Sequence, residues 1–160
     1  MSPFSQLASI AVLLSVAGCS SVGDNTLVTA GQYPAANGSA PVPRYVATMR
    51  VNNYADERKQ GNPRLLGIST LLVRGLRGNQ LLLDQDMANL VTAEIKNQFV
   101  AEGYQVLEGS AASDALIEVT GVVKDFTLNV KNRDEINIAI ETTVKDLRSG
   151  AAIWSGMGAE

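Results

Sequence analysis

The chain has 160 residues, which is enough for one compact domain and little more. A hydrophobic share of 46% and a charged share of 18% are typical of a chain that folds around a core, which excludes an intrinsically disordered protein. The net charge of −3 leaves no strongly basic footprint, so nucleic acid is excluded as a general partner.

The first segment has the pattern of a cleaved targeting peptide. Leu7 to Val16 is an uncharged apolar run, long enough for the core of a signal peptide and too short to cross a bilayer as a helix. Small residues then precede the only cysteine, in Val16-Ala17-Gly18-Cys19, which matches the lipobox of bacterial lipoproteins. We expect residues 1–18 to be a lipoprotein signal peptide, with peptidase cleavage between Gly18 and Cys19 and lipid attached to Cys19.

Lipidation of Cys19 predicts where the protein works. One acyl chain anchors a protein only marginally, whereas diacylglycerol together with palmitate would hold it stably on a membrane. Ser20 rather than Asp follows the cysteine, and under the usual bacterial sorting rule this resemblance implies the outer membrane, with the protein facing the periplasm. Residues 19–43 are rich in Ser, Gly, Ala, Asn and Pro and are expected to form a flexible tether after the lipidated residue.

The folded domain is expected over residues 44–160 and begins with strands. Alternation of apolar and polar residues predicts a first strand with Tyr45, Ala47, Met49 and Val51 on its buried face. Asn53 to Arg64 is predicted to be a loop, in which the charge cluster Asp56-Glu57-Arg58-Lys59 is a solvated turn. Leu65 to Arg74 and Leu81 to Leu83 are predicted to be strands on either side of a turn at Gly75 to Asn79.

A helix is predicted next, from Asp84 or Asp86, either of which can cap its N-terminus, to Glu102, with Gly103 ending it. Apolar residues recur at spacings of three and four in one stripe, formed by Met87, Leu90, Val91, Ile95 and Phe99. Polar residues are expected to face solvent on the other side: Glu94, Lys96, Asn97 and Glu102. We interpret the stripe as core packing and not as a cofactor site.

The last third is predicted to be strand-rich. After a short strand at Tyr104 to Leu107 and a loop at Glu108 to Asp114, three antiparallel strands follow: Ala115 to Val130, Glu135 to Leu147, and Ala151 to Trp154. The middle strand is expected to bury Ile136, Ile138, Ile140, Thr142 and Val144. The expected fold class is α+β, with a mainly antiparallel sheet covered on one face by an amphipathic helix.

Charge is unevenly distributed along the domain. Residues 44–77 hold seven basic and two acidic residues, whereas residues 84–125 hold eight acidic and two basic ones. Two interpretations stay open: ordinary solvated faces, or a basic strand face that meets a partner or anionic lipid headgroups. Neither interpretation implies catalysis.

The order of these elements resembles the YajG-type family of bacterial outer-membrane lipoproteins. Besides the lipobox, three stretches carry the resemblance: Ala55-Asp56-Glu57-Arg58, Gly103-Tyr104-x-Val106, and Ala115-Leu116-Ile117-Glu118-Val119. The closing Ser149 to Gly156 is similar to the strand that ends LpoB-type activators of penicillin-binding proteins, and to one in CsgG-like envelope lipoproteins. The alternative interpretation of Trp154 in that stretch is a core aromatic residue on a terminal strand.

Catalysis is not expected. The chain has no histidine, which excludes Ser-His-Asp and Cys-His nucleophilic sites and the usual zinc sites. No glycine-rich phosphate motif is present. The carboxylate pairs Asp84 with Asp86 and Asp134 with Glu135 are explained more simply by helix capping and by turn formation. We therefore expect no catalytic residue, no metal and no cofactor.

The function expected from the sequence is that of a non-catalytic, membrane-anchored periplasmic lipoprotein that serves as an accessory or binding module. Its partner is expected to be a protein or a cell-wall component, and not nucleic acid or a small-molecule substrate. Two narrower roles stay open, an activator of a peptidoglycan synthase and a subunit of a secretion or surface-appendage complex. We also expect a further helix beyond Glu160, because one helix is too narrow to cover four or five strands.

Overall fold

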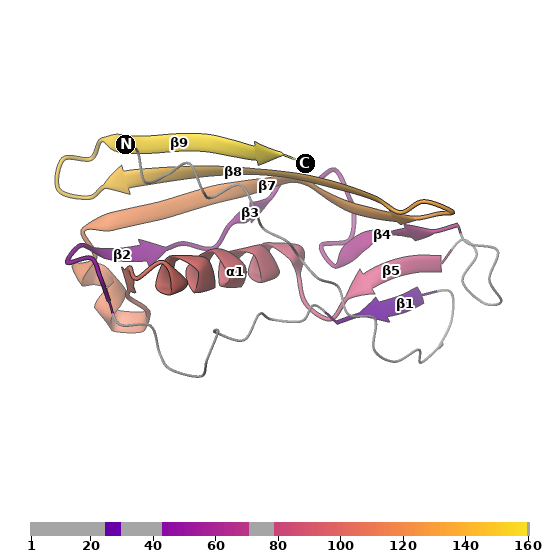
Figure 1. Cartoon of the computed structure of the whole chain (residues 1–160), viewed down its shortest axis with the longest axis horizontal. Helices are drawn as coiled ribbons and strands as arrows, with labels where there is room; N and C mark the ends of the chain where they lie inside the picture. Colours follow the sequence, from indigo (N-terminus) through magenta and orange to yellow (C-terminus); the bar gives the residue numbers. More distant parts are fainter. Residues whose placement is uncertain (1–24, 30–42, 71–78, 160) are drawn as a thin grey trace.

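The structure is a computed structural model that describes residues 25–29, 43–70 and 79–159. Nine strands form one mixed sheet in these residues, and one α-helix packs on it (Figure 1). The strands are β1 (Asn25–Val28), β2 (Thr48–Val51), β3 (Ala55–Asp56), β4 (Leu65–Ser69), β5 (Asn79–Leu83), β6 (Gln105–Val106), β7 (Ile117–Val130), β8 (Glu135–Asp146) and β9 (Ala152–Ala159). The helix is α1 (Met87–Ala101), and a 3₁₀ helix follows at Gly109–Asp114.

Strand β7 organises the sheet because it pairs along both of its edges. On one edge it runs antiparallel to β8, from Ile117 opposite Asp146 to Asn129 opposite Glu135. On the other edge β2, β3 and β4 pair with it one after another, and all three are parallel to it. Figure 1 shows α1 beside β2 and β3, while β4, β5 and β1 lie toward the opposite end of β7.

The mixed character of the sheet corrects the sequence prediction. The α+β class and the antiparallel β7–β8–β9 meander are confirmed, but the prediction of a mainly antiparallel sheet is wrong. Parallel pairs join β1 to β5, β2 to β6, and β7 to each of β2, β3 and β4. Alternation identifies a strand and its buried face, but not its neighbour. The long connections that precede β7, including α1, are what parallel pairing requires.

Helix α1 supplies one side of the core and contacts β2, β3, β6 and β7. The predicted stripe is confirmed, since Met87, Leu90, Val91 and Phe99 are buried and Ile95 is partly buried. The capping prediction is wrong in its chemistry: Asp86 occupies the N-cap position, but its side chain makes no capping hydrogen bond. The Met87 N–H donates instead to the Pro63 carbonyl at 3.0 Å. Gly103 ends the helix with a φ of +93°, a conformation that favours glycine.

A bulge in β7 keeps its apolar residues on one face. The register with β8 shifts between Val123 and Asp125, which leaves Lys124 as an extra residue. Val119 and Val123 are buried before the bulge, and Phe126 is buried after it. Strict alternation from Val123 would place Phe126 on the solvent side, because a shift of one residue exchanges the faces of a strand. The bulge therefore continues the core along the whole strand.

The start of the domain differs from the predicted strand. Strand β2 begins at Thr48, because the N–H groups of Arg44 and Tyr45 both donate to the Gly103 carbonyl, at 2.7 and 3.2 Å. Tyr45 consequently stacks on Tyr104, with ring centroids 4.3 Å apart, and is 44% exposed instead of buried. In the segment expected to be a tether, residues 25–28 form β1, whose pairing with β5 buries Val28.

The C-terminal strands also differ from prediction at their ends. Strand β9 continues to Ala159 instead of ending at Trp154. Trp154 is partly buried against the core, as the alternative interpretation expects, and its ring lies over Gly156. On β8, Ile140 and Val144 are buried, but Ile136 is 48% exposed. Ile136 lies next to the β7–β8 turn, and β8 is not among the strands that α1 mainly contacts.

Candidate functional site

The two carboxylate pairs, for which helix capping and turn formation are the expected roles, form no shared site in the described structure. Gly18 and Cys19 lie outside the described residues. Asp84, Asp86, Asp134 and Glu135 are all exposed. The turn interpretation fits the second pair, because Glu135 accepts a hydrogen bond from the Lys131 ammonium at 3.0 Å across the β7–β8 turn. Neither carboxylate pair forms a buried acid–base site.

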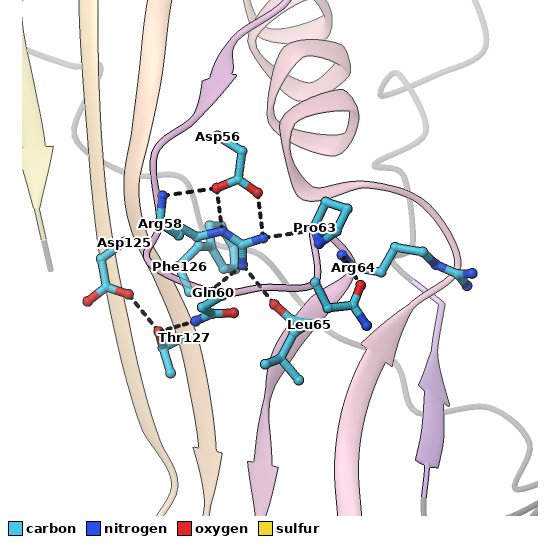
Figure 2. Close-up of polar contacts among 10 residues, drawn as sticks. Asp56, Arg58, Gln60, Pro63, Arg64, Leu65, Asp125, Phe126 and Thr127 are labelled. Atoms are coloured by element: carbon cyan, nitrogen blue, oxygen red, sulfur yellow. Dashed lines mark hydrogen bonds and ion pairs between the residues drawn. The ribbon is translucent and has the colours of Figure 1, made fainter.

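The most elaborate polar arrangement centres on Arg58, whose side chain is only 2% exposed. All five N–H groups of its guanidinium donate hydrogen bonds (Figure 2). Nε and Nη2 bind the two carboxylate oxygens of Asp56 at 2.9 and 2.8 Å. The remaining donors bind the carbonyls of Pro63 at 2.8 Å, Leu65 at 2.8 Å and Phe126 at 3.3 Å.

This arrangement makes Arg58 a clamp between strands. Asp56 lies on β3, Leu65 on β4 and Phe126 on β7, so one side chain ties three segments that are distant in sequence. Because the planar guanidinium uses its whole set of donors, it has none left for a ligand. We interpret Asp56 and Arg58 as a structural pair and not as a binding site.

The burial of Arg58 corrects the prediction of a solvated turn. Glu57 and Lys59 of the same charge cluster are exposed as predicted, but Arg58 is not. A run of charges normally marks a solvated face, and the carbonyls that satisfy Arg58 cannot be found from local sequence. The signal that could have found it is the Asp-x-Arg spacing in Ala55-Asp56-Glu57-Arg58, the stretch that resembles the YajG-type family.

A second polar chain lies beside the clamp (Figure 2). The Gln60 side-chain amide donates to the Thr127 hydroxyl at 3.4 Å, and that hydroxyl donates to Asp125 at 2.6 Å. The Gln60 Oε1 atom is buried and has no protein partner. A primary amide is neither an effective acid nor an effective base near neutral pH, so these hydrogen bonds do not form a relay for acid–base catalysis. It positions side chains between the Arg58 loop and β7.

The pKa values of the described residues do not favour acid–base catalysis. Hydrogen bonding from Arg58 lowers the pKa of Asp56, and hydrogen bonding from Arg50 lowers the pKa of Glu118. Burial raises the pKa of Tyr54. Every pKa that departs clearly from its usual value in the described residues moves away from neutrality. A general acid or base needs a pKa near the working pH, and these shifts go in the opposite direction.

Two ion pairs of the described residues join the basic segment to the acidic one. Arg50 of the basic segment binds Glu118 of the acidic segment, with Nη2 and Oε1 2.7 Å apart. Glu57 of the basic segment pairs with Lys124 of the acidic one. Arg50 is therefore not a free cation on a basic strand face, and for this residue the interpretation as an ordinary solvated face is favoured.

An open groove of about 670 Å³ lies along α1 between Asn53 and β6. Its lining is polar at Asn53, Asn89, Lys96, Asn97 and Glu108, and Lys96 and Glu108 form an ion pair at 3.0 Å. Within residues 25–29, 43–70 and 79–159, no group of His, Cys, Asp or Glu is placed to hold a metal ion. No helix in these ranges is long and apolar enough to cross a membrane.

Comparisons with known proteins find relatives only at the level of fold. No family model matches the sequence, and no curated protein matches it. Protein XCC0632 from Xanthomonas campestris, of the DUF330 family, is similar in structure with a TM-score of 0.56 and 11% identity, over 84% of this chain and 76% of that one. PelC from Paraburkholderia phytofirmans, a dodecamer, has a TM-score of 0.51 and 16% identity, over 76% of this chain and 77% of that one.

The C-terminal domain of LpoB from Escherichia coli has a TM-score of 0.44 and 11% identity, over 78% of this chain and 87% of that one. At such identities the likeness to XCC0632 and PelC shows the fold alone. This chain therefore shares its fold with XCC0632 and PelC. The resemblance to the YajG-type family stays a prediction, because no family model matches.

Proposed function

We propose that this chain is a lipid-anchored protein of the bacterial cell envelope that acts by binding a partner and not by catalysis. The observation that carries the proposal is the lipobox Val16-Ala17-Gly18-Cys19 at the end of an apolar leader. The only thiol of the chain stands where lipid would be attached. Two acyl attachments there would hold the protein on the membrane, and the sequence of the leader directs it out of the cytoplasm.

The described domain supports a binding role. Its most buried charged group, Arg58, uses all its donors within the protein, and the pKa shifts of its carboxylates keep them ionised. The chain has no histidine to serve as a base near pH 7. A tethered domain without an activated group acts most simply as an accessory that holds or regulates another component.

The first experiment tests lipidation. Cells that express the full chain are fed a palmitate analogue, and the protein is isolated and examined for label. We expect label on the unaltered chain and on the control Ser21→Ala, and none on Cys19→Ser, because only the cysteine thiol accepts diacylglycerol. Label that survives Cys19→Ser would refute the lipid anchor.

A second experiment tests which of the two membranes holds the protein. Under the usual sorting rule, the unaltered chain with Ser20 is expected in the outer membrane, whereas Ser20→Asp is expected to be retained in the inner membrane. Separation of the two membranes by density gradient measures both. Equal distribution of the two variants would contradict outer-membrane sorting by the residue after Cys19.

The identity of the partner distinguishes the two narrower roles, an activator of a peptidoglycan synthase and a subunit of a secretion or surface-appendage complex. Crosslinking in intact cells that captures a penicillin-binding protein would support an activator of a peptidoglycan synthase. Ring-shaped particles made of this chain would support a subunit of a secretion or surface-appendage complex, and PelC, which shares the fold, is a dodecamer. Capture of neither, with the purified protein bound to cell-wall fragments, would support a cell-wall ligand.

A further inference from the structure

The strand nearest to the lipobox cysteine in the sequence is β1, which starts at Asn25 and pairs with β5. Five residues, 20–24, separate it from Cys19. An extended chain spans at most about 3.6 Å per residue, so the Cα atoms of Cys19 and Asn25 are at most roughly 22 Å apart. This distance is shorter than the hydrocarbon core of a bilayer, which is about 30 Å thick. A lipid on Cys19 therefore keeps β1 close to the membrane surface.

The chain enters the sheet at the end that carries the β7–β8 turn. One row of paired residues crosses β1, β5, β4, β7 and β8 there: Asn25, Gln80, Ile68, Asn129 and Glu135. Figure 1 shows β1, β5 and β4 together at the end of the molecule away from β2. The surface formed by β1, β5 and β4 is therefore the described surface that a short tether brings to the membrane.

The outer face of these three strands exposes aliphatic side chains. Residues that pair across neighbouring strands point to the same side of a sheet, and so do residues two apart in one strand. Leu27, two residues after Asn25, therefore lies on the same face as Ile68. Leu27 is 48% exposed and Ile68 is 44% exposed, whereas Val28 is buried on the other face. Leu82 pairs with Leu27 and completes a surface that we call the aliphatic patch: Leu27, Ile68 and Leu82.

The aliphatic patch is continuous and neutral. Ile68 and Leu82 are diagonal neighbours on the antiparallel pair β4–β5, within reach of each other's side chains. Strands β1, β4 and β5 contain no charged residue. Asn25 and Gln80 lie on the same face beside the patch, and their amides can form hydrogen bonds with lipid headgroups. Apolar side chains with polar neighbours fit the boundary between headgroups and acyl chains.

We propose that the aliphatic patch contacts the bilayer that holds the lipid anchor, with Leu27, Ile68 and Leu82 at the level of the headgroups. The inference rests on the proposed function, because the lipid on Cys19 is what brings the patch to the membrane. Three aliphatic side chains would hold an unanchored domain only weakly. A short tether makes the contact intramolecular, so that even a weak contact is favoured. The same tether selects the bilayer as the occupant, because the bilayer is always within reach of β1.

The test uses fluorescence quenching in the lipidated full chain, where acylation of Cys19 leaves an introduced cysteine as the only free thiol. Ile68→Cys carries a fluorophore, and the protein is reconstituted into phosphatidylcholine vesicles with brominated acyl chains, which quench a fluorophore that reaches them. Ile136→Cys is the matched control, because Ile136 is 48% exposed at the same end of the sheet but follows Glu135 and so lies on the opposite face. We expect quenching at Ile68→Cys to exceed that of the control by roughly threefold or more.

A second pair of variants tests the chemistry of the contact. With the fluorophore at Leu27→Cys, the substitution Ile68→Glu is expected to lower the quenching by roughly twofold or more, because a carboxylate resists transfer out of water. Ile136→Glu, on the opposite face, is expected to leave the quenching at Leu27→Cys unchanged. Circular dichroism checks that the variants fold.

Flotation of the vesicles separates failure of the anchor from failure of the docking surface. A protein that does not float with the vesicles has no lipid anchor, which overturns the proposed function and the docking together. A protein that floats, but in which Ile68→Cys is quenched no more than Ile136→Cys, overturns the docking alone. Equal loss of quenching from Ile68→Glu and Ile136→Glu would also overturn the docking, because the contact would not depend on the aliphatic patch.

Discussion

Removal of the Arg58 side chain is expected to be one of the most damaging single changes in the domain. Arg58→Ala leaves the Asp56 carboxylate without its partner and deprives three carbonyls, those of Pro63, Leu65 and Phe126, of their donor. Breaking a buried ion pair by removing one partner costs about 3 to 5 kcal/mol. Since a domain of this size is stable by about 5 to 15 kcal/mol, the loss is a large part of the total.

Two further variants determine the source of this cost. Arg58→Lys keeps the positive charge but has three donors in place of five and no planar fork, so we expect a loss of about 2 kcal/mol. Lys59→Ala, at an exposed neighbour, is expected to change stability by less than about 0.5 kcal/mol. Urea unfolding of the purified proteins, followed by circular dichroism, measures the free energy of unfolding of all three variants. The dependence of that free energy on urea concentration should be the same in each.

The pH dependence gives an independent check. Arg58 lowers the pKa of Asp56, so this carboxylate adds stability above its unfolded pKa of about 3.9 and loses it as pH falls through the folded value. The difference in stability between the unaltered protein and Arg58→Ala should therefore narrow below about pH 4. A loss under about 1 kcal/mol at pH 7 for Arg58→Ala would refute the clamp.

Three other outcomes are expected from urea unfolding. Phe99→Ala should cost about 3 to 5 kcal/mol by leaving a cavity under α1, and a loss under about 1 kcal/mol would contradict the assigned helix face. Gly121→Ala should cost roughly 1 to 3 kcal/mol, because a Cβ there would lie 2.0 Å from the Tyr54 ring; with Tyr54→Ala the combined cost should fall below the sum. Glu118→Gln should lower the stability of the protein above about pH 4.3, where the carboxylate whose pKa Arg50 lowers is ionised. The loss should shrink as pH falls through the folded pKa of Glu118, and a loss independent of pH would contradict this ion pair.

The sequence predicts those parts of the fold that depend on local periodicity. Spacings of three and four identify the buried stripe of α1 from Met87 to Phe99, and turn residues delimit β7, β8 and β9. These signals need only the residues of one segment. In a meander, strands that pair are also consecutive in the sequence. The antiparallel part of the sheet was therefore predictable.

The remaining features depend on contacts between distant segments. The sequence near β2 and β4 does not indicate that both strands lie parallel to β7. The sequence around Lys124 likewise gives no signal of the bulge at that residue. Arg58 is the clearest case, because the Phe126 carbonyl that it binds lies 68 residues away. Its burial follows from the paired strands and not from its own neighbours in the chain.

The placement of β7 has a consequence for the order in which the chain becomes available to fold. Strands β2, β3 and β4 precede β7, yet each finds its long parallel neighbour only there. When the chain is delivered N-terminus first, by the ribosome or across a membrane, β4 can pair with β5 and β2 with β6, but the edges of β2, β3 and β4 that pair with β7 stay open until Val130 has emerged. Unpaired strand edges and exposed apolar surface in a partly folded chain favour aggregation and are bound by chaperones. Strand β7 supplies the parallel partner of β2, β3 and β4 in one step.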